Sequence, residues 1–289
     1  MTTKNAGRIA LFMMAAAASA LLMPAVHRLR AHANGQETLE RIKRHALALH
    51  ACNDAYKRLP PACDGFADIP RPATVHVHLL RFLGEDDLHG SFRDGAARTA
   101  GRAVALHAPS DATLGDGAGV QNFAANLRVF SDVGINCGRG QYLPVPLSRV
   151  MPGTAGLPRS FPDGTSNTVV FATRLANCTQ EGALGGSDIA GGSHYAADPT
   201  SPYAAFFGEN AATTTAHTTD PATTFQLAPR EGECRVWPLL AQSYDSRGLT
   251  VAMADGSARL ITPNVTPQTW NQALQPNDGC YSSCWGGDW

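Results

Sequence analysis

Charge is scarce in this sequence. Only 16% of its 289 residues are Asp, Glu, Lys or Arg, and the formal net charge is -1. Because no block of Lys and Arg is present, the chain lacks the electrostatic footprint that a nucleic-acid backbone requires. We therefore expect no nucleic-acid partner. Turn formers are abundant instead, with 28 Gly and 19 Pro, which favours short strands joined by many turns over a helical bundle.

The sequence also lacks the short motifs of common catalytic chemistry. It has no G-x-S-x-G, no H-E-x-x-H and no Walker loop, and no strand pattern leads into a G-x-G-x-x-G. Each of these motifs places a nucleophile, a metal or a phosphate at a fixed point of a fold. Without them we expect a protein that is not an enzyme and needs no cofactor.

Closely paired cysteines of the C-x-x-C kind are absent too, which argues against a zinc site. The seven cysteines are instead spread along the chain, at positions Cys52, Cys63, Cys137, Cys178, Cys234, Cys280 and Cys284. In an exported protein such cysteines predict structural disulfides, here with one left over. Cys52 with Cys63 and Cys280 with Cys284 are the nearest pairs and the first candidates, but the sequence leaves the connectivity open.

What the chain does have is one long uncharged run at its N-terminus. Lys4 and Arg8 precede the run from Ile9 to Val26, and Arg28 and Arg30 follow it. As a helix these residues would extend about 27 Å, close to the thickness of the hydrocarbon core of a bilayer. The run therefore predicts delivery to a membrane, with the lipid bilayer as a partner.

The fate of this segment stays open. It can remain as a single-pass anchor in the inner membrane, with a cytoplasmic N-terminus and a periplasmic or extracellular head. It can also be a cleaved signal, since Ala18-Ser19-Ala20 and Ala31-His32-Ala33 both fit a small-x-small cleavage site. A buried helix of a cytosolic protein is the third alternative. Pro24 would kink a spanning helix without ending it.

Three parts follow from the pattern: the anchor or signal segment at 1–33, an amphipathic helix at 34–59 and a β-rich head at 60–289. The helix places Leu39, Ile42, Ala46 and Leu49 on one face. Leu59-Pro60-Pro61 ends it. His45 and His50 are expected to be solvated or to face a partner.

Within the head we expect short strands at 121–130, 168–173, 235–240, 249–253 and 258–261. The stretch TVHVHLLRFL at 74–83 begins with a strand-like alternation, which would expose His76 and His78, although its second half fits a short helix equally well. Residues 208–224 are low in complexity and are predicted to form a surface loop.

Two Asp-Gly pairs predict turns. In FPDGTSNT, at 161–168, polar side chains can cap exposed backbone groups. Asp163 and Asn167 are weak candidates for binding calcium, because one carboxylate is too few for a self-contained site. Asp255-Gly256 lies between VAMA and ARLI and predicts a β-hairpin.

Several stretches together resemble a large bacterial family of pseudopilin-like proteins. That family has a prepilin-type N-terminal segment and a C-terminal His-(nine residues)-Asp-Gly motif, and its domain is of unknown function. The matching positions include Pro24 in LLMPAV, His50 in LALH, Pro60, Pro61, PSD at 109–111, NFAAN at 122–126, Asp163, Gly164, Thr165, Ser166, Asn167, Thr168, Gln242-Ser243, Asp255 and Gly256.

The resemblance implies an α+β fold of the type IV pilin kind. The first half of a long N-terminal helix would span the membrane, and the second half would pack on an antiparallel sheet with long loops. It also implies a non-enzymatic structural subunit of a cell-envelope, secretion or pilus-like assembly, with homologous pseudopilin subunits as partners. An exported soluble module that binds carbohydrate or calcium is the alternative.

The sequence departs from the family at two places. Aligned on Pro24, the Gly, Phe and Glu of the prepilin peptidase signal are replaced by Thr2, Thr3 and Gly7. The histidine of the C-terminal motif is replaced by Asp245.

Overall fold

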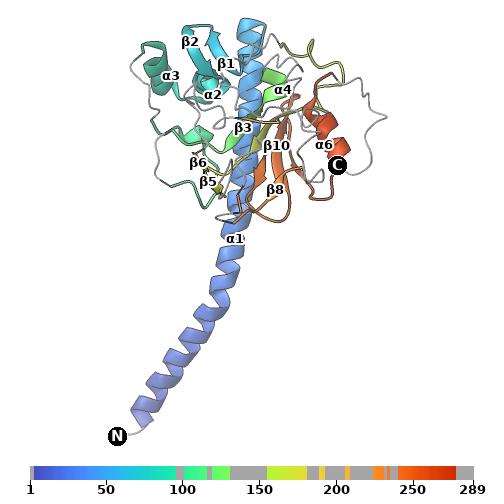
Figure 1. The fold of residues 1–289 in the computed structure, drawn as a ribbon. Coiled ribbons are helices and arrows are strands. Elements are labelled where there is room, and N and C mark those ends of the chain that lie inside the picture. The colour runs from blue at the N-terminus through green and yellow to red at the C-terminus, as the bar shows by residue number, and fades with distance from the viewer. Residues whose placement is uncertain are drawn as a thin grey trace.

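The computed structural model describes residues 3–95, 101–115, 119–130, 155–180, 189–192, 206–208, 224–230, 233–234 and 240–277. One long N-terminal helix carries a head of helices and strands (Figure 1). The mixed α+β class predicted from the sequence is confirmed.

Helix α1 runs without a break from Thr3 to Tyr56, over 54 residues or about 80 Å. Pro24 lies inside it, and Asn34-Gly35 does not interrupt it, so the segments at 1–33 and 34–59 share one continuous helix, as the long helix implied by the resemblance requires. Gly35 is where Arg247 crosses the helix, since a Cβ atom there would lie 3.0 Å from the Arg247 Nη2 atom.

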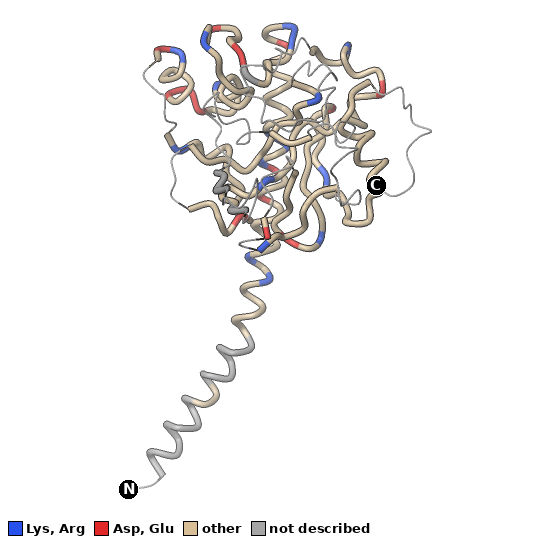
Figure 2. The backbone as a smooth tube through the Cα atoms, viewed as in Figure 1, with Lys and Arg blue, Asp and Glu red and all other residues tan. Residues whose placement is uncertain are grey.

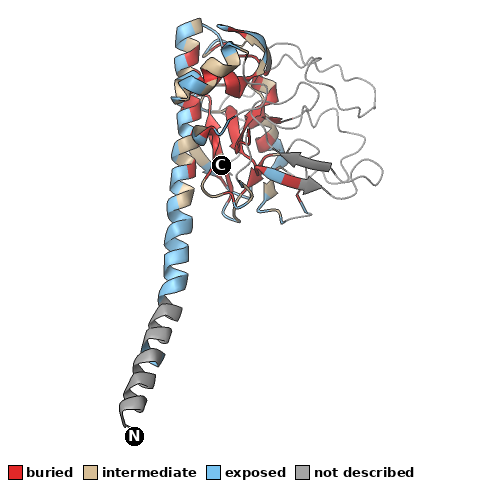
Figure 3. Cartoon of the chain, turned by 90° about the vertical axis from the view of Figure 1, so that its left-hand side faces the viewer, coloured by how far each residue is buried: buried red, intermediate tan, exposed pale blue. Residues whose placement is uncertain are grey.

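The part of α1 up to residue 33 extends away from the head, and we call residues 3–33 the stalk (Figures 1 and 3). Among the described residues, no helix is both long and apolar enough to cross a membrane. Most of the run from Ile9 to Val26 consists of residues whose side chains lie outside the described part.

A five-stranded sheet forms the centre of the head, in the order β11-β10-β4-β3-β7. The strands are β3 (Phe123–Asn126), β4 (Val169–Thr173), β7 (Phe206–Phe207), β10 (Leu249–Met253) and β11 (Ala258–Ile261). Only the β3–β7 pair is parallel, so the sheet is mixed and not wholly antiparallel as expected. Three of the five predicted strands are confirmed, and the strand predicted at 121–130 is confirmed only as β3, because Leu127–Phe130 form a short helix. Residues 235–239 of the fifth lie outside the described residues.

The sheet is covered on both faces. On one face Ile42 and Leu49 of α1 pack in the same cluster as Phe123 and Phe171. On the other, Trp270 of α6 (Pro267–Leu274) lies in a second cluster and contacts the ring of Phe207, with centroids 6.3 Å apart. Residues of β3 alternate between the two clusters, as the pleat of a strand requires. In β4 the consecutive residues Val170 and Phe171 both face α1, where the pairing with β10 shifts register.

The smaller elements lie around this core. They are β1 (Cys63–Phe66) with β2 (Ile69–Thr74), α2 (Val75–Leu79), η1 (Leu80–Leu83), α3 (Asp86–Arg93), η2 (Val104–Leu106), α4 (Leu127–Phe130), β5 (Asn177–Gln180) with β6 (Ile189–Gly192), and β8 (Gln226–Leu227) with β9 (Gln242–Ser243).

The histidines correct two expectations. His76 and His78 lie in the short helix α2 and not on an exposed strand, and both are buried. His45 is buried as well, against the rings of Phe123 and Phe171. The physical reason is the same in each case, because a neutral imidazole can be buried when its N–H donates to a backbone carbonyl oxygen.

The disulfide is not one of the nearest pairs. It joins Cys178 of β5 to Cys234, 56 residues further along the chain. Cys52, a candidate from the sequence, is instead a free thiol on the buried face of α1, and burial raises its pKa to about 12. The side chain of Cys63 lies outside the described residues, as do Cys280 and Cys284.

Candidate functional site

Segments that carry the sequence motifs meet around the C-terminal part of α1. His50 is half-buried, and its Nε2 atom donates to the carbonyl oxygen of Ala254, 2.9 Å away. Gly256 follows in the turn between β10 and β11 with φ of +88°, and a Cβ atom there would lie 3.3 Å from Leu47 and 3.6 Å from His50. The LALH segment and the Asp-Gly hairpin therefore contact each other directly.

The hairpin itself is as predicted. Met253 donates its N–H to the carbonyl oxygen of Ser257 at 2.9 Å, and the Asp255 carboxylate accepts from the N–H of Ser257 at 2.8 Å. The side chain of Asp255 is thus bonded within its own turn. Asp245, at the position of the missing motif histidine, forms an exposed ion pair with Arg247, with nitrogen and oxygen 2.6 Å apart.

The DGTSNT loop bonds mostly to itself. Asn167 Nδ2 donates to the carbonyl oxygen of Asp163 at 2.8 Å, and Thr168 Oγ1 donates to that of Gly164 at 3.3 Å. The backbone of Thr168 accepts from Ala254 at 2.8 Å, which links the loop to the hairpin. Ser166 is exposed and Thr165 half-buried. Among the described residues, no group of three or more His, Cys, Asp or Glu side chains is placed to hold a metal ion.

The end of α1 is fixed by a residue that sequence reasoning missed. Asn53 donates to the carbonyl oxygen of Leu157 at 3.4 Å and accepts from the N–H of the same residue at 3.0 Å. Pro60 and Pro61 follow the helix and are buried. Asn53 lies three residues after His50, so helical spacing could have suggested that both side chains bond into the head.

A second polar centre joins the PSD and NFAAN segments. The buried carboxylate of Asp111 accepts from Asn122 Nδ2 at 2.6 Å, from the N–H of Ala176 at 2.7 Å, and from both the N–H and the hydroxyl of Thr113 at 2.8 Å. Four donors satisfy this carboxylate. Burial and the nearby Asp111 raise the pKa of the Tyr244 hydroxyl, which donates to the carbonyl oxygen of Arg174 at 3.0 Å.

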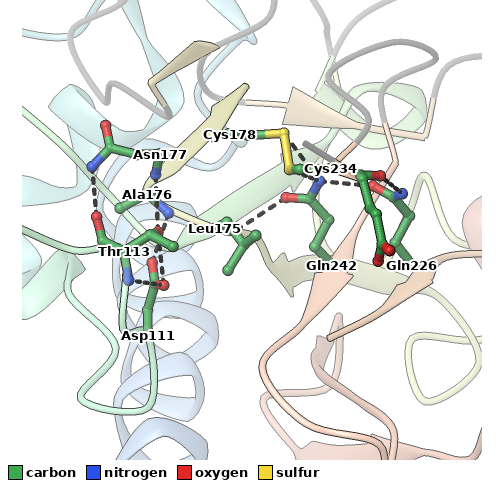
Figure 4. The surroundings of a disulfide bond; sticks show 10 residues. Asp111, Thr113, Leu175, Ala176, Asn177, Cys178, Gln226, Cys234 and Gln242 are labelled. Carbon is green, nitrogen blue, oxygen red and sulfur yellow. Dashed lines mark hydrogen bonds between the residues drawn. A yellow bond between two sulfur atoms is a disulfide. The ribbon is translucent and has the colours of Figure 1, made fainter. Parts of the chain in front are cut away.

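The disulfide lies next to this centre (Figure 4). Gln242 donates to Cys234 Sγ at 3.1 Å and to Gln226 Oε1 at 3.0 Å, and it accepts from the N–H of Leu175 at 3.2 Å. The motif residue Gln242 therefore links the disulfide to the end of β4, and its role is to position these segments.

Three buried histidines bond to backbone carbonyl oxygens, His45 within α1 and His76 and His78 of α2 to other segments. The carbonyl oxygens of Arg41, Phe123 and Asp64 accept from His45, His76 and His78 at 2.9, 2.6 and 2.9 Å. Burial lowers the pKa of these histidines to about 4, about 3 and about 4 respectively. They are neutral at pH 7 and structural.

A groove of about 490 Å³ runs along the head part of α1. Its lining residues come from α1, η1, η2 and the segment between them: Glu37, Glu40, Arg41, Arg44, Leu47, Ala48, Ala51, Phe82, Leu83, Glu85, Val104 and Ala105. Two large apolar side chains, Leu47 and Val104, are 51% and 52% exposed in or beside it. We refer to this surface as the groove; the side chain of Arg41 crosses it to the carbonyl oxygens of Val104 and His107, both 2.9 Å away.

A model of one protein family matches most of the chain. The family is described as "Protein of unknown function (DUF1559)", and the match covers residues 39–268, that is 230 of 289 residues. It spans the head part of α1, the sheet and the first residues of α6, and leaves the stalk outside. No curated protein and no solved structure matches the chain.

Proposed function

We propose that this chain, which belongs to the DUF1559 family of proteins of unknown function, is a non-enzymatic, pseudopilin-like structural subunit held in the inner membrane by its N-terminal helix. The head then lies outside the cytoplasm, as part of a cell-envelope, secretion or pilus-like assembly. The observation that carries this proposal is the contrast between the two halves of the continuous helix α1.

The head half of α1 is part of the core, since Ile42 and Leu49 are fully buried. The stalk instead exposes large apolar side chains, with exposed fractions of 61–70% at Met13, Met14, Leu22, Met23 and Leu29. Covering each such side chain contributes about 1.5–3 kcal/mol. A bilayer can cover the uncharged run from Ile9 to Val26, which supports a role for the stalk as the anchor.

The disulfide supports the location of the head. Cys178 and Cys234 are joined, and such bonds persist in oxidising compartments outside the cytoplasm. The motif side chains support a structural role, because His50, Asn53 and Gln242 bond to other segments of the head.

Fractionation of bacteria that express the full chain tests the proposal. We expect the chain in the membrane fraction after an alkaline carbonate wash, with a head that protease reaches only from the periplasmic side. Met14→Glu with Leu22→Glu should release it, because two charges in the apolar run raise the free energy of insertion. Ala31→Glu, beyond the run, is the matched control and should stay in the membrane. A wild-type chain that carbonate extracts would refute the anchor.

A further inference from the structure

Three side chains in the core beside α1 each keep one polar atom without a hydrogen-bond partner among the described residues. The atoms are His45 Nε2, His76 Nδ1 and Thr173 Oγ1, and all three residues are 0% exposed. Nearly all buried polar atoms of folded proteins are hydrogen-bonded, because leaving one unpaired costs free energy. The three atoms therefore indicate a partner that the described part of the chain does not itself supply.

The three side chains lie around the same two aromatic rings. The ring of His45 has its centroid 4.7 Å from that of Phe123 and 5.8 Å from that of Phe171, and the ring of His76 lies 5.9 Å from Phe171. Thr173 follows Phe171 by two residues in β4 and pairs with Phe123 across the sheet. Because residues two apart, and residues directly opposite, point to the same face of a sheet, Thr173 also faces α1.

The hydrogen bonds that the two rings do make fix which nitrogen of each carries the proton. His45 Nδ1 lies 2.9 Å from the carbonyl oxygen of Arg41, and His76 Nε2 lies 2.6 Å from that of Phe123. A carbonyl oxygen only accepts, so these two nitrogens carry the ring protons. Burial lowers the pKa of the rings to about 4 and about 3, and both are neutral at pH 7. The other nitrogen of each ring is then an acceptor without a proton.

The three unpartnered atoms cannot satisfy one another. The two bare ring nitrogens are both acceptors, and the hydroxyl of Thr173 has one proton for two of them. A water molecule has two protons to donate and two lone pairs that accept, and a buried water typically makes about three hydrogen bonds. Two acceptors and one hydroxyl donor match this requirement.

We propose that one ordered water molecule lies between α1, α2 and β4, where it donates to His45 Nε2 and His76 Nδ1 and accepts from Thr173 Oγ1. Side-chain hydrogen bonds of α1 reach other segments at its sides, such as the hydroxyl of Ser110 and the carbonyl oxygen of Ala254. The water links α1 to the two elements packed on it in the centre of the core. The inference concerns the head alone and goes beyond the proposed function, so it stands whether or not the stalk is an anchor.

A metal ion is the other partner that bare imidazole nitrogens can take. Among the described residues, no third His, Cys, Asp or Glu completes such a group. The surrounding elements α2, β3 and β4 contain no charged residue and are tan along their length in Figure 2. A cation at this place would be buried without a counter-charge, which is costly. A neutral water fits better, and a metal becomes an outcome of the test.

A high-resolution crystal structure of the full chain in detergent tests the site, with data collected also at the zinc and copper absorption edges. We expect a density peak without anomalous signal at about 2.6–3.2 Å from both ring nitrogens and from Thr173 Oγ1. An anomalous peak would overturn the water in favour of a metal. An empty site, or a side-chain rotation that bonds Thr173 directly to one ring, would overturn it as well.

Nuclear magnetic resonance of the full chain with ¹⁵N-labelled histidine tests the donors and acceptors in solution. At pH 7.5 the ring proton should lie on Nδ1 of His45 and on Nε2 of His76, and both rings should show cross-peaks to a long-lived water. His45→Gln and His76→Gln assign the signals. The opposite tautomer at either ring places a proton where the water has to donate, and contradicts the proposal.

The hydroxyl is tested by a change that keeps the shape of the side chain. Thr173→Val removes one of the three hydrogen bonds of the water and should raise the unfolding equilibrium constant about fivefold. Thr173→Ser is the matched control, because it keeps the hydroxyl and should keep the water peak. A Thr173→Val chain as stable as the parent would show that the hydroxyl has no partner to lose.

Paired replacements show whether the two rings share one ligand. His45→Leu and His76→Leu each leave the other ring and the water without a partner, whereas the double variant makes the site apolar. The double variant should therefore be no less stable than the less stable single variant. His45→Leu with His107→Leu is the control, since His107 is buried outside the site on the carbonyl oxygen of Val120, and these two effects should add. Additive effects of His45→Leu and His76→Leu would contradict a shared water.

Discussion

Acidification should unfold the head well before most carboxylates are protonated. His45, His76 and His78 are buried as neutral rings, and burial lowers their pKa from 6.5 to about 4, about 3 and about 4. Because these folded-state values lie below that of the unfolded chain, the stability they contribute is complete above pH 6.5. It is lost as the pH falls from 6.5 toward 4, since the unfolded chain then binds more protons.

The magnitude follows from the linkage relation. At pH 5 an unfolded chain binds a proton at nearly every histidine, whereas the folded head binds almost none at these three. Each histidine then favours unfolding by about 2 kcal/mol, and the three together by about 6 kcal/mol. Since whole domains are stable by about 5–15 kcal/mol, this loss decides whether the head stays folded.

The neighbouring charges do not reverse this direction. His45 lowers the pKa of His76 further, and His89 acts in the same sense on His78. The opposing contributions on His78 are its hydrogen bonds to the backbone of Asp64 and Ala73 and, less strongly, the Asp68 carboxylate. Desolvation is the largest cause for all three rings.

The assay is denaturant unfolding of the full chain in detergent between pH 7.5 and 4.5, followed by near-ultraviolet circular dichroism. We expect the free energy of unfolding to fall by about 4 kcal/mol per pH unit between pH 6 and 5. His76→Gln should be less stable at pH 7.5 but should lower this slope by about one third, because one titrating ring is gone. His32→Gln, on the exposed stalk, should keep the parent slope. A free energy of unfolding that is constant from pH 6.5 to 5 would refute the reasoning.

Three further changes test the head. Gly256→Ala forces a Cβ atom toward Leu47 at positive φ and should lower the free energy of unfolding by about 1–3 kcal/mol; unchanged denaturation would contradict the tight contact. Reduction of Cys178–Cys234 should lower the free energy of unfolding by about 2–4 kcal/mol, measured by melting with and without reductant, and unchanged melting would contradict the bond. Calcium titrated calorimetrically onto the full chain should give no heat and no shift of melting temperature, whereas saturable heat would favour the calcium-binding alternative.

The features that could be read from the sequence are local. The Asp255-Gly256 turn and its two strands were predicted to the residue, because an Asp-Gly pair between apolar runs specifies a hairpin by itself. The buried face of α1 was predicted because helical spacing alone identifies Ile42 and Leu49. The DGTSNT loop is local as well, because Asn167 and Thr168 donate to carbonyl oxygens of Asp163 and Gly164 in the same loop.

The features that could not be predicted from the sequence depend on segments that are distant along the chain. The buried ring of His76 donates to the carbonyl oxygen of Phe123, 47 residues away. Nothing near His76 in the sequence indicates that partner. Likewise the pairing of Cys178 with Cys234 follows from where β5 and the segment before β9 lie in the fold, and sequence distance favoured other pairs.

The contact between His50 and Ala254 belongs to neither group. Its two segments were recognised as motifs, but 204 residues separate them, and only the fold shows that LALH and the Asp-Gly hairpin meet. Motif resemblance therefore pointed to His50 and to the hairpin separately, and the fold shows that their contact holds α1 against the sheet.

The intact mass of the mature chain in the carbonate-washed membrane fraction tests most directly whether α1 anchors the head in a membrane. We predict a chain that retains residues 9–26. A mature chain that begins after Ala20 or Ala33 and is found in the soluble fraction would contradict the claim, because the stalk that is to serve as the anchor would have been removed.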